Sequence, residues 1–69
     1  MEKEKLKRMF EENEAELLRL DEIEEGYRQN PDIERDKRIQ LLVSLEDTRQ
    51  RRLRLREKLL KEMVDEVMS

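Results

Sequence analysis

The sequence predicts an all-α protein, an antiparallel two-helix hairpin of coiled-coil type that dimerises into a four-helix bundle. Three observations lead to this fold class. Among the 69 residues, 51 % are charged and 3 % aromatic, and the helix-forming residues leucine, glutamate, lysine and arginine dominate. Apolar residues recur at steps of three and four over two long segments, whereas a charged disordered chain has no reason for such periodicity. The only glycine and the only proline, Gly26 and Pro31, lie close together between those segments.

The first segment predicts a helix over residues 3–27. At about 100° per residue, its apolar side chains fall within an arc of roughly 140°, as expected for a helix that buries one side. The residues of this arc are Leu6, Met9, Phe10, Leu17, Leu20, Ile23 and Tyr27. Two endings stay open: Gly26 could adopt the left-handed conformation that closes a helix, or the helix could continue to Arg28 with Tyr27 on its apolar side.

A turn over residues 28–30 and a second helix over residues 31–67 follow. Asn30 is a good helix cap, Pro31 fits the first helical position, and Asp32 complements the positive end of the helix dipole. Because the residue before a proline avoids helical geometry, a short connection between antiparallel helices is favoured over one continuous bent helix.

The second helix carries two apolar rows. The first is a seam with alternating steps of four and three, formed by Leu41, Leu45, Thr48, Arg52, Leu55, Leu59 and Met63. The other row, which we call the second stripe, lies roughly 100° further round the helix. It consists of Ile39, Leu42, Leu53, Leu60, Val64 and Val67. One neighbouring helix cannot cover both rows.

Pairing the two helices across the turn predicts a register in which Leu20 faces Leu41 and Leu6 faces Leu55. Asn13 then lies opposite Thr48, which predicts a polar layer that fixes the register at some cost in stability. In the same register Met1 lies opposite Leu60. Residues 61–69 are therefore expected to extend beyond the first helix without an intramolecular partner.

This overhang and the second stripe predict a surface that binds another protein. The candidate partner-binding residues are Leu42, Leu53, Leu60, Met63, Val64, Val67 and Met68. A small chain without cysteine or histidine has neither disulfides nor the usual metal ligands, so association is the remaining way to enlarge its core. We therefore expect a small adaptor, assembly factor or inhibitor that acts as a homodimer, binds a foreign protein, or does both.

Nucleic-acid binding is the alternative function. Residues 49–61 contain seven bases and one acid, and four of the bases share an outward face at steps of three, four and three. These candidate phosphate-binding residues are Arg51, Arg54, Lys58 and Lys61. The net charge of −3 and the lack of an aromatic residue on that face argue against this alternative.

The composition argues against catalysis. Without histidine and cysteine, the chain lacks the usual general base, thiol chemistry and the common zinc ligand sets. We expect no enzyme activity, no cofactor, no metal and no small-molecule substrate. The longest apolar run, residues 41–43, is far shorter than the roughly 20 residues that cross a bilayer. With no cysteine and no signal peptide, a cytoplasmic protein is expected.

Overall fold

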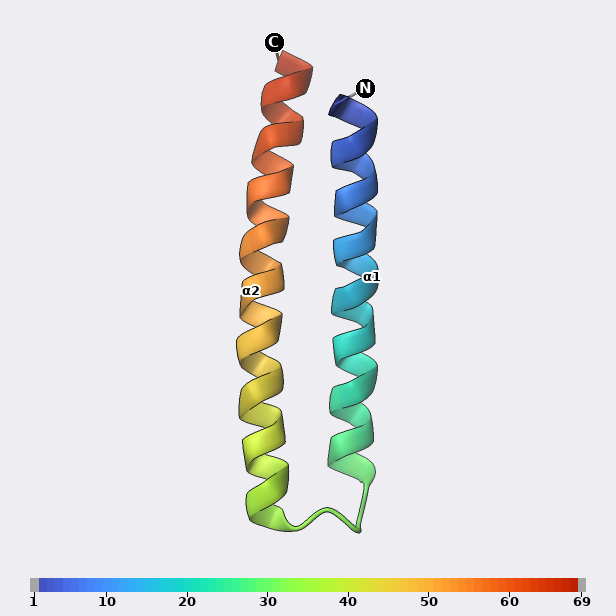
Figure 1. Ribbon diagram of the computed structural model, residues 1–69, viewed down its shortest axis with the longest axis vertical. Coiled ribbons are helices and arrows are strands. Elements are labelled where there is room, and N and C mark those ends of the chain that lie inside the picture. Colours follow the sequence, from blue (N-terminus) through green and yellow to red (C-terminus); the bar gives the residue numbers. More distant parts are fainter. Residues whose placement is uncertain (1, 69) are drawn as a thin grey trace.

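The chain folds into two antiparallel helices, α1 (Glu2–Gln29) and α2 (Arg35–Met68), of 28 and 34 residues. This computed structural model describes residues 2–68. The helices lie side by side with both ends of the chain at the same end of the molecule (Figure 1). The Cα atoms span 52 × 15 × 12 Å. The predicted all-α hairpin is therefore confirmed, and the alternative of one continuous bent helix is wrong.

Helix α1 continues beyond Gly26 to Gln29, two residues past the predicted end at Tyr27. The backbone NH of Asn30 donates a hydrogen bond of 3.1 Å to the carbonyl of Gly26, which extends the helical pattern to the start of the loop. Gly26 does not have the positive φ of a left-handed cap. It is an ordinary position of the helix.

The connection is longer than predicted, because α2 begins at Arg35 and not at Pro31. The Asn30 side chain accepts a hydrogen bond of 3.0 Å from the NH of Asp32, which makes a turn rather than the cap of a helix. The backbone of Asn30 is hydrogen-bonded to α1. If α2 began at Pro31, no residues would remain between the helices to span the ~8–10 Å that separate packed helix axes. Residues 30–34 make that crossing.

Arg38, in the first turn of α2, forms hydrogen bonds with the loop and with the end of α1. Its guanidinium donates hydrogen bonds to the carbonyls of Tyr27 at 3.1 Å, Asn30 at 2.6 Å and Ile33 at 3.1 Å. The carbonyls at the end of a helix have no partner within the helix and carry the negative end of its dipole. A cation from the first turn of α2 thus satisfies the end of α1.

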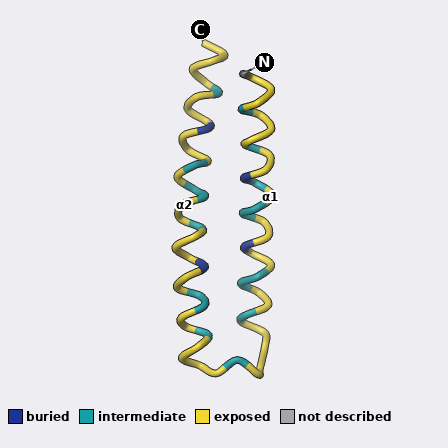
Figure 2. The backbone as a smooth tube through the Cα atoms, in the orientation of Figure 1, coloured by how far each residue is buried: buried dark blue, intermediate teal, exposed yellow. Residues whose placement is uncertain are grey.

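Few side chains are buried between the helices. Among residues 3–68 these are Leu20, Leu45 and Leu59 together with one polar residue, Asn13. They lie along the line where the helices face each other (Figure 2). A hairpin of two helices therefore has a thin core, as expected for a chain of this length.

The register differs from the predicted one by about one helical turn. The Asn13 side-chain amide donates a hydrogen bond of 2.9 Å to the carbonyl of Arg52, not to Thr48. Thr48 is exposed, and its hydroxyl donates to the carbonyl of Ser44 in its own helix. Helix α1 ends two residues later than predicted and α2 begins four residues later, and this shift of the loop along the chain accounts for the displacement.

The predicted overhang is correspondingly shorter. Met63 and Val67 of α2 line a hollow of about 330 Å³ together with Leu6 of α1, so the two helices still meet near residue 63. Helix α2 extends only slightly past α1 (Figure 1). The prediction that the chain lacks an intramolecular partner from Lys61 onward is therefore wrong. Met1 and Ser69, which entered that prediction, lie outside the described residues.

Candidate protein-interaction surface

The second stripe lies on one side of α2, next to the line of contact with α1. Leu42 and Leu53 are half-buried at the edge of the helix interface. The other members are exposed to solvent, and they are Ile39, Leu60, Val64 and Val67. Helix α1 leaves these residues uncovered, because it packs on the seam, the other apolar row of α2.

Near its C-terminal end, α2 has a shallow apolar hollow of about 300 Å³. It is lined by Leu60, Met63, Val64, Val67 and Met68. The structure thus brings together five of the seven predicted partner-binding residues, while Leu42 and Leu53 lie further along the same side toward the loop. Met63 and Val67 also line the hollow between the two helices, so both belong to the hairpin interface as well as to this surface.

Another hollow, also of about 300 Å³, lies between the helices at mid-length, and we call it the mid-length hollow. Leu53 lines it together with residues of α1. Its lining is Glu14, Leu17, Leu18, Asp21, Arg49, Leu53 and Arg56. Leu18 was not among the candidate residues, although it is 62 % exposed. The sequence pattern that could have identified Leu18 is the pair Leu17–Leu18. Leu17 belongs to the apolar arc of α1, so Leu18 must point outside that arc.

Ion pairs across the helices border this hollow. Arg56 lies 2.8 Å from Glu14. Arg49 is within 3.1 Å of Asp21, 2.7 Å of Glu24 and 2.8 Å of Glu46, measured between guanidinium nitrogens and carboxylate oxygens. Both arginines lie on the same side of α2 as Leu53, and both bind acids of α1. The side of the hairpin that carries the second stripe is therefore an apolar row flanked by charge.

Arg49 changes the acidity of its partners. Its hydrogen bond lowers the pKa of Glu24 below the ordinary value, and a hydrogen bond from Arg28 adds to this effect. Hydrogen bonds from Gln50 and then from Arg49 lower the pKa of Glu46. In return, chiefly the hydrogen bond with Glu24 raises the pKa of Arg49. Each shift favours the charged form. Of the two carboxylates only Glu24 lies on α1, so its ion pair with Arg49 links the two helices at neutral pH, whereas Glu46 belongs to α2 as Arg49 does.

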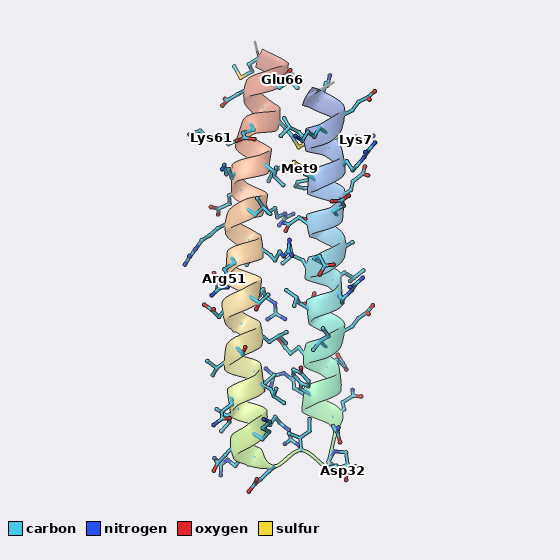
Figure 3. The ribbon with its side chains drawn as sticks, viewed as in Figure 1. Lys7, Met9, Asp32, Arg51, Lys61 and Glu66 are labelled. Carbon is cyan, nitrogen blue, oxygen red and sulfur yellow. The ribbon has the colours of Figure 1, made fainter. Side chains whose placement is uncertain are left out.

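The four bases of the alternative interface lie on the outer side of α2. Arg51, Arg54, Lys58 and Lys61 are all exposed. Figure 3 shows Arg51 and Lys61 pointing away from α1. Arg51 forms an ion pair of 2.9 Å with Asp47. The bases and the second stripe thus occupy different sides of the same helix.

Within residues 2–68, no three acidic side chains gather closely enough to hold a metal ion. Over the same residues, neither helix combines the length and the apolar character needed to cross a membrane. Comparison of the chain with protein-family models, curated proteins and solved structures finds no significant match.

Proposed function

We propose that the chain is a non-enzymatic protein–protein interaction module that packs the second stripe of α2 against the helices of another hairpin, completing a four-helix bundle. The observation that carries this proposal is the exposure of Leu60, Val64 and Val67 on one side of a helix while three leucines are buried within the hairpin. Contiguous exposed apolar surface on a small protein marks an interaction site.

The chemistry of the surface supports the same function. The C-terminal hollow is lined by aliphatic side chains and two methionines, Met63 and Met68, which adapt to the shape of a partner. Charged side chains border the apolar row, as in interfaces with an apolar centre and a polar rim. With neither histidine nor cysteine, the chain offers little for catalysis.

The test uses two valines of α2 with similar exposure. Val64 lies in the second stripe and is 53 % exposed, whereas Val43 is 65 % exposed and lies outside the stripe. Tagged chains that carry Val64→Lys or Val43→Lys are used in pull-downs from a lysate of the native host. The lysate also contains an untagged copy of the natural chain, and the proteins that each variant captures are compared. We expect the Val43 variant to retain the same proteins as the natural chain and the Val64 variant to lose them. Identical capture by both variants would contradict the proposal.

A second candidate function is binding of nucleic acid through the outer side of α2. The observation that favours it is the exposed row of Arg51, Arg54, Lys58 and Lys61, whose spacing can follow a series of phosphates. Changing these four bases to glutamine should weaken binding to duplex DNA and RNA and reduce its dependence on salt, measured by fluorescence anisotropy. Unchanged affinity would reject this interface.

A further inference from the structure

We infer that the partner is a second copy of the same chain, packed face to face on a two-fold axis that crosses the hairpin at Glu14 and Leu53. This inference rests on the proposed function and names its partner. The face concerned is the side of the hairpin that carries the second stripe of α2 and the residues of α1 that line the mid-length hollow. Three independent features of that face lead to it.

The first feature is the symmetry of α2 about Leu53. Ile39 and Val67 lie 14 residues before and after it, and Leu42 and Val64 lie 11 residues before and after it. When two copies of α2 run antiparallel with Leu53 against Leu53, Ile39 meets Val67 of the second copy and Leu42 meets Val64 of the second copy. Ile39, Val64 and Val67, which are exposed in the single hairpin, thereby each meet an apolar residue.

Charged positions of α2 obey the same symmetry. Arg49 and Glu57 lie four residues before and after Leu53, so opposite charges meet in the antiparallel pair. Glu46 and Leu60 lie seven residues before and after it. In this layer the long side chain of Glu46, which Arg49 already holds at 2.8 Å, borders the aliphatic centre.

The second feature is the symmetry of α1 about Glu14. Phe10 and Leu18 lie four residues before and after Glu14, and they bring an aromatic and an aliphatic side chain together. Further out along the same side, positively charged residues meet negatively charged ones. Lys7 meets Asp21 of the second copy, seven residues from the centre, and Lys3 meets Glu25 of the second copy, 11 residues from it.

The third feature is tertiary. A single two-fold axis needs both centres of symmetry at the same height in the hairpin. Glu14 and Leu53 line the same mid-length hollow, and Arg56, about one helical turn from Leu53, forms an ion pair of 2.8 Å with Glu14. Each Glu14 thus reaches the axis with its charge already neutralised by an arginine. Nothing in the sequence of either helix requires this coincidence.

Other ways of stacking two hairpins fit worse. Rotation about the long axis would set α2 against α1 of the second copy, with Leu60 near Lys7 and Leu42 near Glu25, so apolar residues would meet charges. The opposite side of α2 is polar and carries Ser44. The face itself is large enough, since an outline of 52 × 15 Å is roughly the 800 Å² per partner that stable complexes bury.

The natural chain has no cysteine, so single cysteines report the arrangement. In the dimer, Leu53→Cys places the two thiols at the axis, where a disulfide can form because it needs Cα atoms about 4.4–6.8 Å apart. We expect the Leu53 variant to cross-link at least roughly tenfold faster than Val43→Cys, because the dimer gives the paired thiols a millimolar effective concentration.

A mixture tests the direction of pairing. Leu42→Cys and Val64→Cys should cross-link with each other but slowly with themselves, since two copies of Leu42 are about 33 Å apart in the dimer. Faster cross-linking of Leu42→Cys with itself would overturn the antiparallel register. Sedimentation of the natural chain as a monomer over a wide concentration range would overturn self-pairing altogether. In that case, selective loss of captured host proteins in the Val64→Lys pull-down would still support the proposed function with a foreign partner.

Discussion

Replacing Asn13 by leucine is expected to stabilise this hairpin, although the change removes a hydrogen bond. Asn13 is 1 % exposed, and its amide nitrogen donates to the carbonyl of Arg52 at 2.9 Å. Its Oδ1 is buried without a hydrogen-bond partner. A side chain that fills the same space without a polar group would remove this unsatisfied acceptor.

The magnitude follows from three contributions. A buried acceptor without a partner costs about 1–3 kcal/mol, and the hydrogen bond that is lost contributes about 0.5–1.5 kcal/mol. A fully buried leucine side chain adds about 1.5–3 kcal/mol. Together these contributions make Asn13→Leu more stable by about 1–5 kcal/mol, and each kcal/mol corresponds to a rise in Tm of roughly 4–8 °C for a domain of this size.

Chemical and thermal unfolding at one fixed protein concentration measure this change, with sedimentation as a second readout. Since Asn13 is the one buried polar constraint on register among residues 2–68, the leucine variant should also populate more than one state of association. The isosteric control Asn13→Asp, which buries a charge, should be strongly destabilised. A leucine variant that is less stable than the natural chain would refute the reasoning.

Three further predictions concern the loop, the charge cluster and the glycine. Arg38→Ala should lower stability by about 1.5–3 kcal/mol in urea unfolding, because three backbone carbonyls lose a charged donor. Since the pKa values of Glu24 and Glu46 are lowered in the folded chain, their contribution to stability is present above the ordinary value of 4.5 and is lost as the pH falls through the lowered values. Gly26→Ala should stabilise α1 by about 0.5–1 kcal/mol in thermal unfolding, since an added Cβ meets nothing within 4 Å and φ is not positive.

Each of these has an outcome that speaks against it. Unchanged stability of the Arg38 variant would mean that water serves the three carbonyls equally well. The pH dependence of stability is compared between the natural chain and Arg49→Met. If the free energy of unfolding of this variant falls as steeply between pH 7 and pH 3, the ion pairs of Arg49 do not contribute to the pH dependence. A destabilised Gly26→Ala variant would indicate that α1 ends at the glycine.

The sequence predicted the secondary structure well because helical periodicity is local. Leu20, Leu45 and Leu59 were all placed on the faces that the helices bury. The second stripe was placed on a side of α2 that is indeed left largely exposed. Residues at steps of three and four share a face whatever the rest of the chain does, so both observations follow from short-range spacing.

The length of the connection was predicted wrongly because it depends on the distance between the helices. Asn30 and Pro31 have the residue types of a helix start, yet here they form a turn. The contacts of Arg38 and the ion pairs of Arg49 were missed for a related reason. Both arginines bind groups 11 or more residues away on the other side of the loop, and no spacing pattern within one helix reports such contacts.

By itself, the sequence determined two amphipathic helices, the apolar second stripe, and an order of charges and apolar residues that is symmetric about Leu53 in one helix and about Glu14 in the other. Only the tertiary structure decided that these two centres line the same hollow. The predicted register set Asn13 opposite Thr48, whereas the longer loop sets it against Arg52 and brings Glu14 to the hollow of Leu53. Periodicity determines on which side of a helix a residue lies. Which residue of the other helix it faces depends on how many residues the loop needs to span the distance between the two helix axes.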